Sequence, residues 1–402
     1  MTQAKPLPVN TEITFTNRIQ SIDLLRGLVM IIMTLDHSRD FFHYGASMDQ
    51  DPLDFDTTSP VLFLSRWITH FCAPVFVFLS GASVYLYSSK GKTKRQVAFF
   101  LFSRGLWLML VEIFIILPLW NFNFSMVFLQ VIWAIGLSMV VLSVLQFLPY
   151  RLLVVIGLLI VGGHNLLDRV SVGGPVWASM IWSVTHKTAS FPVGHDFMIT
   201  VQYPFLPWLG IMILGYALGK IYLPSTDPAS RKKLLLSMGF AAVALFVLLR
   251  WSNVYGDMHH WSAQKTTLFT CLDFIKTTKY PPSLLYTLMT LGPALIFLAF
   301  AENISGSLKN KILVFGKVPF FYYILHVLLL HTLSWMLFFA TGHHWSDLDF
   351  THFRDGSMPV GSGYPLWVVY LGWITVIVIL YFPCRWYSNY KKSHRQWWLS
   401  YL

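Results

Sequence analysis

The sequence predicts an all-α polytopic membrane protein with about ten transmembrane helices. Of its 402 residues, 55% are hydrophobic and only 12% are charged, whereas soluble domains carry about 25% charged residues. The charged residues also gather in short runs between apolar stretches of about 20 residues, the length that crosses a bilayer. This composition excludes a water-soluble globular protein, and we expect the lipid bilayer to surround the chain.

The predicted spans follow one another from near the N-terminus to near the C-terminus. We place them at 22–43, 59–88, 98–119, 123–148, 152–168, 200–221, 234–251, 283–301, 319–340 and 365–384. No internal repeat or low-complexity tract interrupts this series, so one integral domain is the simplest interpretation. We divide the chain into an N-terminal cytoplasmic tail at 1–20, a transmembrane domain at 21–388 and a basic, aromatic cytoplasmic tail at 389–402.

The distribution of lysine and arginine predicts which connections face the cytoplasm. An even number of spans puts both termini on one side, and the basic runs at 90–95, 220–233, 309–317 and 385–395 lie on that side. Cytoplasmic loops carry the excess of Lys and Arg, so both termini are predicted to be cytoplasmic. The three longest loops, at 169–199, 252–282 and 341–364, are then predicted to face outward.

This topology also explains the formal net charge of +11. The excess of basic residues is the one that a multi-pass protein of the cytoplasmic (inner) membrane needs for its orientation. We therefore expect no nucleic-acid partner. Oligomers are common among membrane enzymes, but nothing in the sequence requires a homo-oligomer.

The first predicted span carries ionisable side chains at both of its ends. Such side chains are costly at membrane depth and mark functional sites by default. The interval from Asp23 to Asp36 spans about 20 Å of helix, so the inner and outer groups are separated by an apolar middle. The inner group is Asp23 and Arg26, and the outer group is Asp36, His37, Arg39, Asp40 and His43.

The outer group is a candidate catalytic site. A neutral imidazole in a partly dry environment suits a general base, and either His43 or His37 fits that description. Asp36 and Asp40 would orient the base, and Arg39 would stabilise charge. The same spacing also fits ordinary ion pairs within one helix, because Arg39 follows Asp36 by three residues.

Other predicted spans bring polar side chains to a similar depth. Arg66 and His70 lie four residues apart in the second span, and we include both among the catalytic candidates. Secondary candidates are Glu112, Gln130, His326 and His331. A single buried histidine is more often a hydrogen-bonded core residue than a catalyst. Polar side chains from several helices at one depth in the membrane nevertheless favour a functional site.

A second cluster of charges lies toward the predicted cytoplasmic ends of the spans. Arg and Lys side chains bind phosphates, so this cluster would hold an anionic cytosolic ligand such as a nucleotide-bearing coenzyme. The alternative is an Asp–Arg pair together with ordinary positive-inside charge. The residues concerned are Asp23, Arg26, Arg104, Lys90, Lys92, Lys94 and Arg95.

We expect no metal cofactor. The three cysteines are far apart in the predicted topology, which excludes a Cys-based metal site of the usual spacing. The pairs His259–His260 and His343–His344 have no third ligand in register.

Three stretches of sequence resemble the catalytic domain of heparan-alpha-glucosaminide N-acetyltransferase and its bacterial relatives. They are RIQSIDLLRG at 18–27, LVMIIMTLDHSRDFFH at 28–43 and RWITHFCAPVFVFLSGAS at 66–83. Weaker matches are YPFLPWLGIMILGYALG at 203–219, KYPPSLLYTLMTLGPAL at 279–295 and FGKVPFFYYILH at 315–326. Aligned without gaps, the family's catalytic Asn falls on His37, its catalytic His corresponds to His43, and an Asp before the next proline is replaced by His70.

The resemblance implies a transmembrane acyltransferase. Such an enzyme would take an acetyl group from cytosolic acetyl-CoA, the acyl donor, and pass it to an amine or hydroxyl of an outward-facing glycan or amino sugar. The resemblance leaves open whether the acetyl group rests on a histidine or passes directly. The alternative function is a proton-coupled small-solute transporter, because intramembrane Asp, Arg and His also suit a carrier. A scaffold would leave the charges of the first span without a role.

Overall fold

Helices make up most of the protein, which confirms the predicted all-α polytopic membrane class. The computed structural model describes residues 19–122, 126–195, 197–350, 358–394 and 396–400. Within these ranges, eight helical segments are long and apolar enough to cross a membrane. The predicted tail at 1–20 lies outside the described residues except for Ile19 and Gln20.

These eight segments account for eight of the ten predicted spans. Four of the segments consist of consecutive helices that follow one another without a long break, and the other four are single helices. The eight segments are α3 (Pro60–Thr69) with α4 (Cys72–Ser88), α5 (Lys94–Val111) with η1 (Glu112–Ile116) and α6 (Leu117–Asn121), α8 (Tyr150–Gly163) with η2 (His164–Leu167), α10 (Phe205–Gly219) with η3 (Lys220–Tyr222), α11 (Pro228–Ser252), α13 (Leu284–Ala301), α15 (Pro319–Ala340) and α16 (Leu366–Ser393).

The other two predicted spans correspond to α1 (Gln20–Phe42) and α7 (Val131–Leu145). The sequence of α1 includes five charged residues, which lowers its mean hydropathy, yet most of its residues are buried inside the protein. Helix α7 is apolar but has only 15 residues. At 1.5 Å per residue it is about 22 Å long, shorter than the hydrocarbon core of a bilayer.

A three-stranded sheet replaces the helix that we predicted at the start of two spans. Strand β1 (Met126–Leu129) pairs in parallel with β3 (Phe197–Val201), and β2 (Ala189–Val193) pairs antiparallel with β3. The predictions of helix from 123 and from 200 were therefore wrong at these residues. Runs such as Met-Val-Phe-Leu are rich in residues that suit strands, and a short apolar run does not distinguish a strand from a buried helix.

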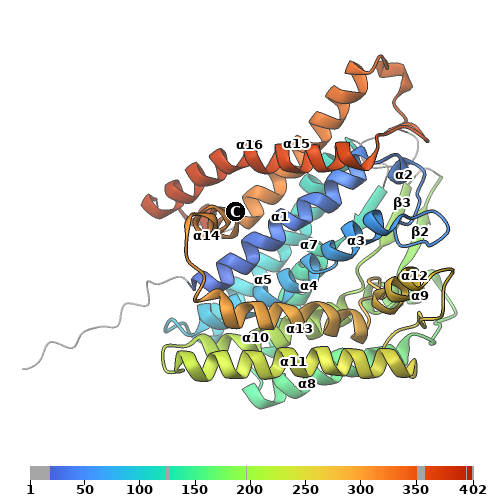
Figure 1. The fold of residues 1–402 in the computed structure, drawn as a ribbon. Coiled ribbons are helices and arrows are strands. Elements are labelled where there is room, and N and C mark those ends of the chain that lie inside the picture. The colour runs from blue at the N-terminus through green and yellow to red at the C-terminus, as the bar shows by residue number, and fades with distance from the viewer. Residues whose placement is uncertain (1–18, 123–125, 196, 351–357, 395, 401–402) are drawn as a thin grey trace, which may run out of the picture.

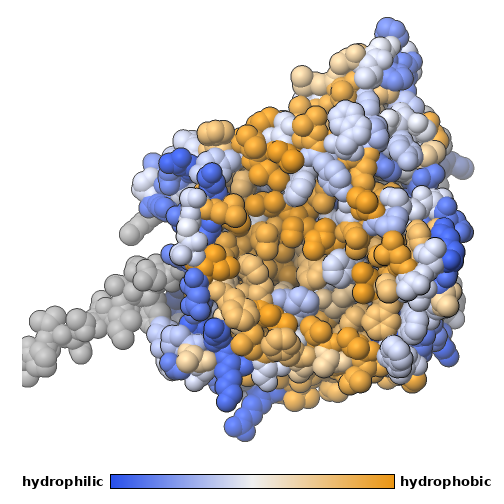
Figure 2. All heavy atoms as spheres, viewed as in Figure 1, coloured by the Kyte–Doolittle hydropathy of each residue, from blue (hydrophilic) through white to orange (hydrophobic). Residues whose placement is uncertain are grey.

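The protein has two polar ends and an apolar middle. In Figure 1, α1 begins and α16 ends at the left, whereas α2 (Tyr44–Ser47), α9 (Val176–Thr185), α12 (Thr267–Ile275) and the sheet lie at the right. Figure 2 shows hydrophobic residues across the middle of the same view and hydrophilic residues at both margins. We call the left end, which holds Asp23, the predicted inner end, and the right end the predicted outer end.

Close contacts between small residues hold the membrane helices together. Helices α4 and α10 pack so tightly that a Cβ at Gly215 would lie 1.9 Å from the carbonyl oxygen of Phe78. A Cβ at Gly81 would lie 2.0 Å from the carbonyl oxygen of Met212. Small residues at such crossings let two backbones approach, as in other membrane helix pairs.

Replacing Gly215 with alanine is therefore expected to destabilise the protein, because the added methyl group meets backbone that cannot give way. Overpacking of this kind costs about 1–3 kcal/mol. The matched control is Gly162→Ala in α8, where an added Cβ meets nothing within 4 Å, and we expect it to be neutral or stabilising. Denaturant titration of both variants in detergent micelles measures the difference, and equal stability of the two would contradict the packing argument.

A buried arginine and a buried aspartate shape the predicted outer loop after α11. The Arg250 guanidinium is fully buried and donates hydrogen bonds to the carbonyl oxygens of Asp273 at 2.8 Å and Lys276 at 2.6 Å. Asp257 accepts from the backbone N–H of Thr278 at 2.9 Å and the Ser283 hydroxyl at 2.6 Å. These bonds fix the chain on both sides of residues 279–282.

The predicted C-terminal tail begins within a helix. Helix α16 continues to Ser393, past the predicted domain limit at 388. Helix α14 (Ser307–Lys317) lies between α13 and α15 in the chain and packs against α1 and α16.

Candidate active site

A cavity of about 450 Å³ opens beside the predicted outer half of α1. Its wall includes six of the seven catalytic candidates, which come from α1, α3 and the residue that follows α1. They are Asp36, His37, Arg39, Asp40, His43 and Arg66. The cavity also receives residues from the ends of β1 and β3, from α15 and from the loop before α13.

Two carboxylates and two guanidinium groups form one ion-pair network on this wall. Asp36 Oδ2 lies 2.5 Å from Arg66 Nη1, and Asp36 Oδ1 lies 3.3 Å from Arg39 Nη2. Arg39 also pairs with Asp40. The predicted pairing within α1 is present, and Arg66 extends it to a second helix.

One guanidinium nitrogen of the network is left without a hydrogen-bond partner in the described part of the chain. Arg39 Nη1 is buried and has no hydrogen-bond partner among the residues that the structure describes. Lys279 adds a third cation at the cavity wall beside the two carboxylates. An arginine N–H without a partner is an available donor for an oxygen of a bound ligand.

His37 is held by a second histidine. Its Nδ1 lies 2.6 Å from Nε2 of His326 in α15. Nδ1 of His326 lies 3.2 Å from the carbonyl oxygen of Tyr322, which can only accept a hydrogen bond. In the neutral pair, Nδ1 of His326 therefore donates to Tyr322, and Nδ1 of His37 donates to Nε2 of His326.

This arrangement leaves Nε2 of His37 without a proton, so that nitrogen can accept one. No group in the described part of the chain is hydrogen-bonded to Nε2, and His37 lines the cavity. Two aromatic rings also pack against the His37 imidazole in T-shaped geometry. The ring centroids of Trp120 and Tyr323 lie 4.9 and 6.1 Å from that of His37. The orienting partner of His37 is thus His326, which we had predicted only as a secondary candidate.

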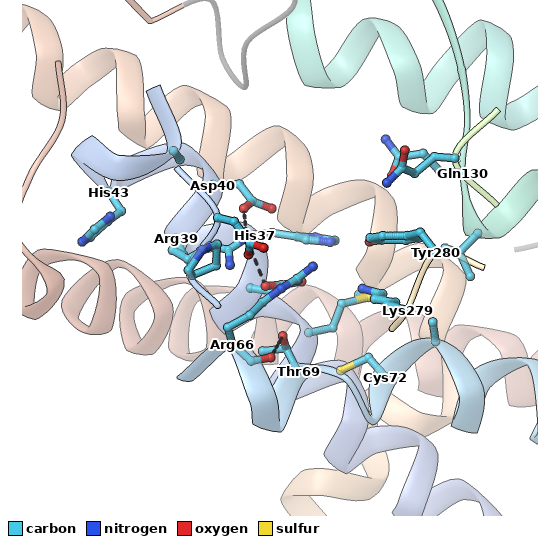
Figure 3. A pocket seen from close by; sticks show the side chains of 18 of the residues that line it. His37, Arg39, Asp40, His43, Arg66, Thr69, Cys72, Gln130, Lys279 and Tyr280 are labelled. Carbon is cyan, nitrogen blue, oxygen red and sulfur yellow. Dashed lines mark hydrogen bonds and ion pairs between the residues drawn. The ribbon is translucent and has the colours of Figure 1, made fainter. Parts of the chain in front are cut away.

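His43 lies at the margin of the same site. Its Nδ1 accepts a hydrogen bond from the backbone N–H of Gly45 at 3.1 Å, and its ring stacks on Tyr44. Figure 3 shows His37, Lys279, Tyr280 and Gln130 around one space, with His43 off to one side beyond Arg39. Of the two candidate bases, His37 has the more central position.

His70 is buried behind the cavity and does not line it. It lies between the end of α3 and the start of α4, four residues before Pro74. Proline has no N–H to donate to the carbonyl oxygen four residues earlier, and the Tyr286 hydroxyl donates to the carbonyl oxygen of His70 instead, at 2.8 Å. Pro74 therefore explains the break that brings Arg66 and His70 to their positions.

The remaining secondary candidates take different positions. Gln130 lines the cavity at the end of β1. Glu112 is buried in the π-helical turn η1 and accepts from the backbone N–H of Trp133 at 3.1 Å. His331 is hydrogen-bonded through Nδ1 to the carbonyl oxygen of Leu119 at 2.7 Å. The structure places Glu112 and His331 in the packing around the site, away from its wall.

A second cavity, of about 130 Å³, lies next to the first, toward the predicted inner end. Arg26 and Arg104 lie on its wall, and most of the other residues there are apolar. Arg26 Nη1 lies 2.9 Å from Asp23, and Nη2 donates to the Ser83 hydroxyl at 3.0 Å. Four residues line both cavities: Met33, Phe76, Val131 and Tyr323.

The basic run before α5 lies on the surface at the predicted inner end. Lys90, Lys92, Lys94 and Arg95 are all exposed, and none of them lines either cavity. Lys94 donates to the carbonyl oxygen of Phe147 at 3.0 Å.

The loop before α13 contributes residues to the cavity that we did not predict from the sequence. Lys279 and Tyr280 line the cavity, as do Gln202 and Tyr203 after β3. The segment KYPPS at 279–283 belongs to a stretch that resembles the family, so that match was an available signal.

Comparison with known proteins identifies the family of the chain. No curated protein matches the chain. The sequence profile described as the catalytic domain of heparan-alpha-glucosaminide N-acetyltransferase matches residues 18–255, which include α1 to α11 and more than half of the chain. The protein therefore belongs to the heparan-alpha-glucosaminide N-acetyltransferase catalytic-domain family, a family of transmembrane acetyltransferases.

Proposed function

We propose that the protein transfers an acetyl group from cytosolic acetyl-CoA to an amine or hydroxyl of a glycan or amino sugar on the outer side of the cytoplasmic membrane. The observation that carries this proposal is the pair of adjoining cavities. One has arginines toward the predicted inner end, the other has His37 toward the predicted outer end, and four residues line both. A donor and an acceptor that arrive from opposite sides would meet at this shared wall.

The smaller cavity suits the donor. Arg26 and Arg104 would bind the phosphates of the coenzyme, because guanidinium groups pair well with phosphate oxygens. Leu108, Ile135 and Met139 give this cavity an apolar wall, which would accept the uncharged arm that carries the thioester. The exposed basic run that includes Lys90 and Arg95 would attract the anionic coenzyme to this end.

The larger cavity suits a polar acceptor. Carboxylates, cations and the amide of Gln130 on its wall offer both donors and acceptors to sugar hydroxyls. A few well-placed polar groups orient a ligand in such a site. These features favour an amino sugar or glycan over an apolar acceptor.

His37 would act as the general base. Its Nε2 takes the proton from the acceptor amine or hydroxyl as the new bond to the acetyl carbon forms. The bond from that carbon to sulfur then breaks, and His37 returns the proton to the leaving thiolate. General acid–base catalysis of this kind contributes about 10²–10⁴-fold to a rate.

Arg39 would stabilise the oxyanion that develops on the acetyl carbonyl. Its Nη1 has no partner in the described part of the protein, whereas Arg66 is engaged with Asp36. A fixed donor aimed at developing charge is worth several kcal/mol in a site that excludes water. Asp36 and Asp40 would hold Arg39 in place.

Reconstitution in liposomes tests the proposal against the transporter alternative. Liposomes that contain glucosamine receive radiolabelled acetyl-CoA outside, and the opposite loading is tested in parallel. We expect labelled N-acetylated product on the side of the acceptor. Movement of unmodified glucosamine that needs no acetyl-CoA, with no acetylated product, would favour a carrier.

Coenzyme binding provides a further prediction for the predicted inner end. Removing Arg26 alone would leave the buried Asp23 without its 2.9 Å partner, so we choose the double variant Asp23→Asn/Arg26→Gln, which keeps the pair neutral. A hydrogen bond to a charged group contributes about 1.5–3 kcal/mol, so we expect coenzyme A to bind about 10- to 100-fold more weakly. Isothermal titration measures this, with the exposed Arg385→Ala as control, and unchanged affinity in the double variant would remove Arg26 from the coenzyme site.

A further inference from the structure

A second cluster of ligand-type side chains lies at the predicted outer end, outside the two cavities. It consists of His164, Asp168 and His186, and its three ligand atoms lie within 4.8 Å of one another. His164 begins η2, Asp168 follows it, and His186 follows α9. The cluster therefore joins the end of the membrane helix α8 to a helix of the loop that follows it.

The two histidines are buried but incompletely hydrogen-bonded. Their exposed fractions are 3% for His164 and 2% for His186. Neither ring nitrogen of His164, nor Nδ1 of His186, has a hydrogen-bond partner among the described residues. A buried polar atom without a partner costs free energy. His164 therefore has a ring nitrogen whose lone pair is available to a ligand, whereas Nε2 of His186 already faces Asp168 Oδ1.

We propose that His164, Asp168 and His186 bind a divalent transition-metal ion of the zinc type. Two imidazoles and one carboxylate are a ligand set that zinc favours, and three protein ligands leave its fourth position for a water molecule. Nε2 of His186 and Oδ1 of Asp168 already lie 2.9 Å apart. Tetrahedral zinc ligands lie about 3.3 Å apart, so side-chain adjustments are enough to complete the site.

Neighbouring residues hold the carboxylate in a position to bind the ion. Asn165 Nδ2 donates to Asp168 Oδ2 at 2.8 Å, which leaves Oδ1 facing His186. Asn165 Oδ1 in turn accepts from the backbone N–H of Leu284, at the start of α13, at 2.8 Å. Residues that orient metal ligands in this way commonly affect metal affinity.

A metal ion here would connect three parts of the predicted outer end. It would bind the end of α8 to α9 directly, and through Asn165 it would be coupled to the start of α13. Residues 279–282, just before α13, include two residues of the active-site wall. The ion would therefore stabilise the scaffold that carries the acceptor side of the cavity, and it would take no part in the acetyl transfer itself.

Metal analysis of the wild-type protein is the first test. The chain is purified through a tag that contains no histidine, from cells grown with added zinc, and the metal is counted by elemental mass spectrometry. We expect one equivalent per chain, and after chelation we expect saturable binding of Co²⁺ with the visible absorption of a tetrahedral site. A metal-free protein that also fails to bind Co²⁺ would overturn the proposal.

Variants then assign the ligands. His164→Ala and His186→Ala should each lose the bound metal, and Asn165→Ala should weaken binding about 10- to 100-fold because it releases the carboxylate. The control is His260→Ala, an exposed histidine of another outer loop, which should leave the metal content unchanged. Wild-type metal content in both His164→Ala and His186→Ala would also overturn the proposal.

A thermal-unfolding measurement separates metal binding from ordinary core packing. Zinc should raise the unfolding temperature of the chelated wild-type protein and leave that of His164→Gln unchanged. An equal zinc effect on both proteins would place the ion elsewhere and contradict the proposal. None of these readouts depends on acetyl transfer, so they are independent of the proposed function.

Discussion

The His37→Ala variant should lose about 10²–10⁴-fold in kcat, the contribution of a general base, while it keeps its fold and its affinity for coenzyme A. The reason is the direction of the hydrogen bonds in the His37–His326 pair. Nδ1 of His37 donates to His326, so Nε2 of His37 is left to accept a proton. Steady-state acetyl transfer to glucosamine in detergent measures the loss. Binding of a fluorescent coenzyme A analogue provides the check on folding.

Two further variants define how His37 works. His326→Gln should retain more activity than His37→Ala, since His326 acts through His37, and its pH profile should shift because the glutamine no longer fixes the same tautomer of His37. His43→Ala tests the other candidate base. Wild-type turnover in His37→Ala together with complete loss in His43→Ala would transfer the assignment to His43.

The Arg66→Met variant should be destabilised by about 3–5 kcal/mol, because it leaves a buried carboxylate without its partner. Asp36 is paired with Arg66 at 2.5 Å, and its other ion-pair partner in the described part of the chain, Arg39, is farther away at 3.3 Å and is shared with Asp40. Denaturant titration in micelles measures the loss of stability.

The double variant Asp36→Asn/Arg66→Met is the matched comparison. Removing both charges should recover most of the lost stability, since replacing a whole buried ion pair is often close to neutral. Activity should remain low in the double variant, because Arg39 loses one of the two carboxylates that hold it. Additive effects of the two substitutions on stability would show that Asp36 and Arg66 do not act as a pair.

The membrane fold could be predicted because its physical cause lies in the composition of each segment. A span must satisfy its own backbone hydrogen bonds and present apolar side chains to lipid, so each membrane helix could be predicted from its own apolar stretch. The prediction of helix was wrong at β1 and β3. These strands satisfy their hydrogen bonds with each other, and that pairing is a property of two distant segments that neither sequence shows alone.

The active site was predictable in part for the same reason. Asp36, His37, Arg39 and Asp40 stood out because each is costly in a membrane helix. Lys279 and Tyr280 did not stand out, because a lysine and a tyrosine are ordinary in a predicted outer loop. Their position at the cavity depends on Arg250 and Asp257, which fold that loop back over the helices.

By itself, the sequence determined that the chain lies in a bilayer, which segments form its membrane helices, and which of these helices carries the costly charges. Only the tertiary structure decided that His326 orients His37, that Arg66 completes the network of α1, and that two cavities adjoin between the predicted inner and outer ends. It also brought His164, Asp168 and His186 together. Segment composition sets the free energy of insertion locally, whereas contacts between side chains depend on how distant helices pack.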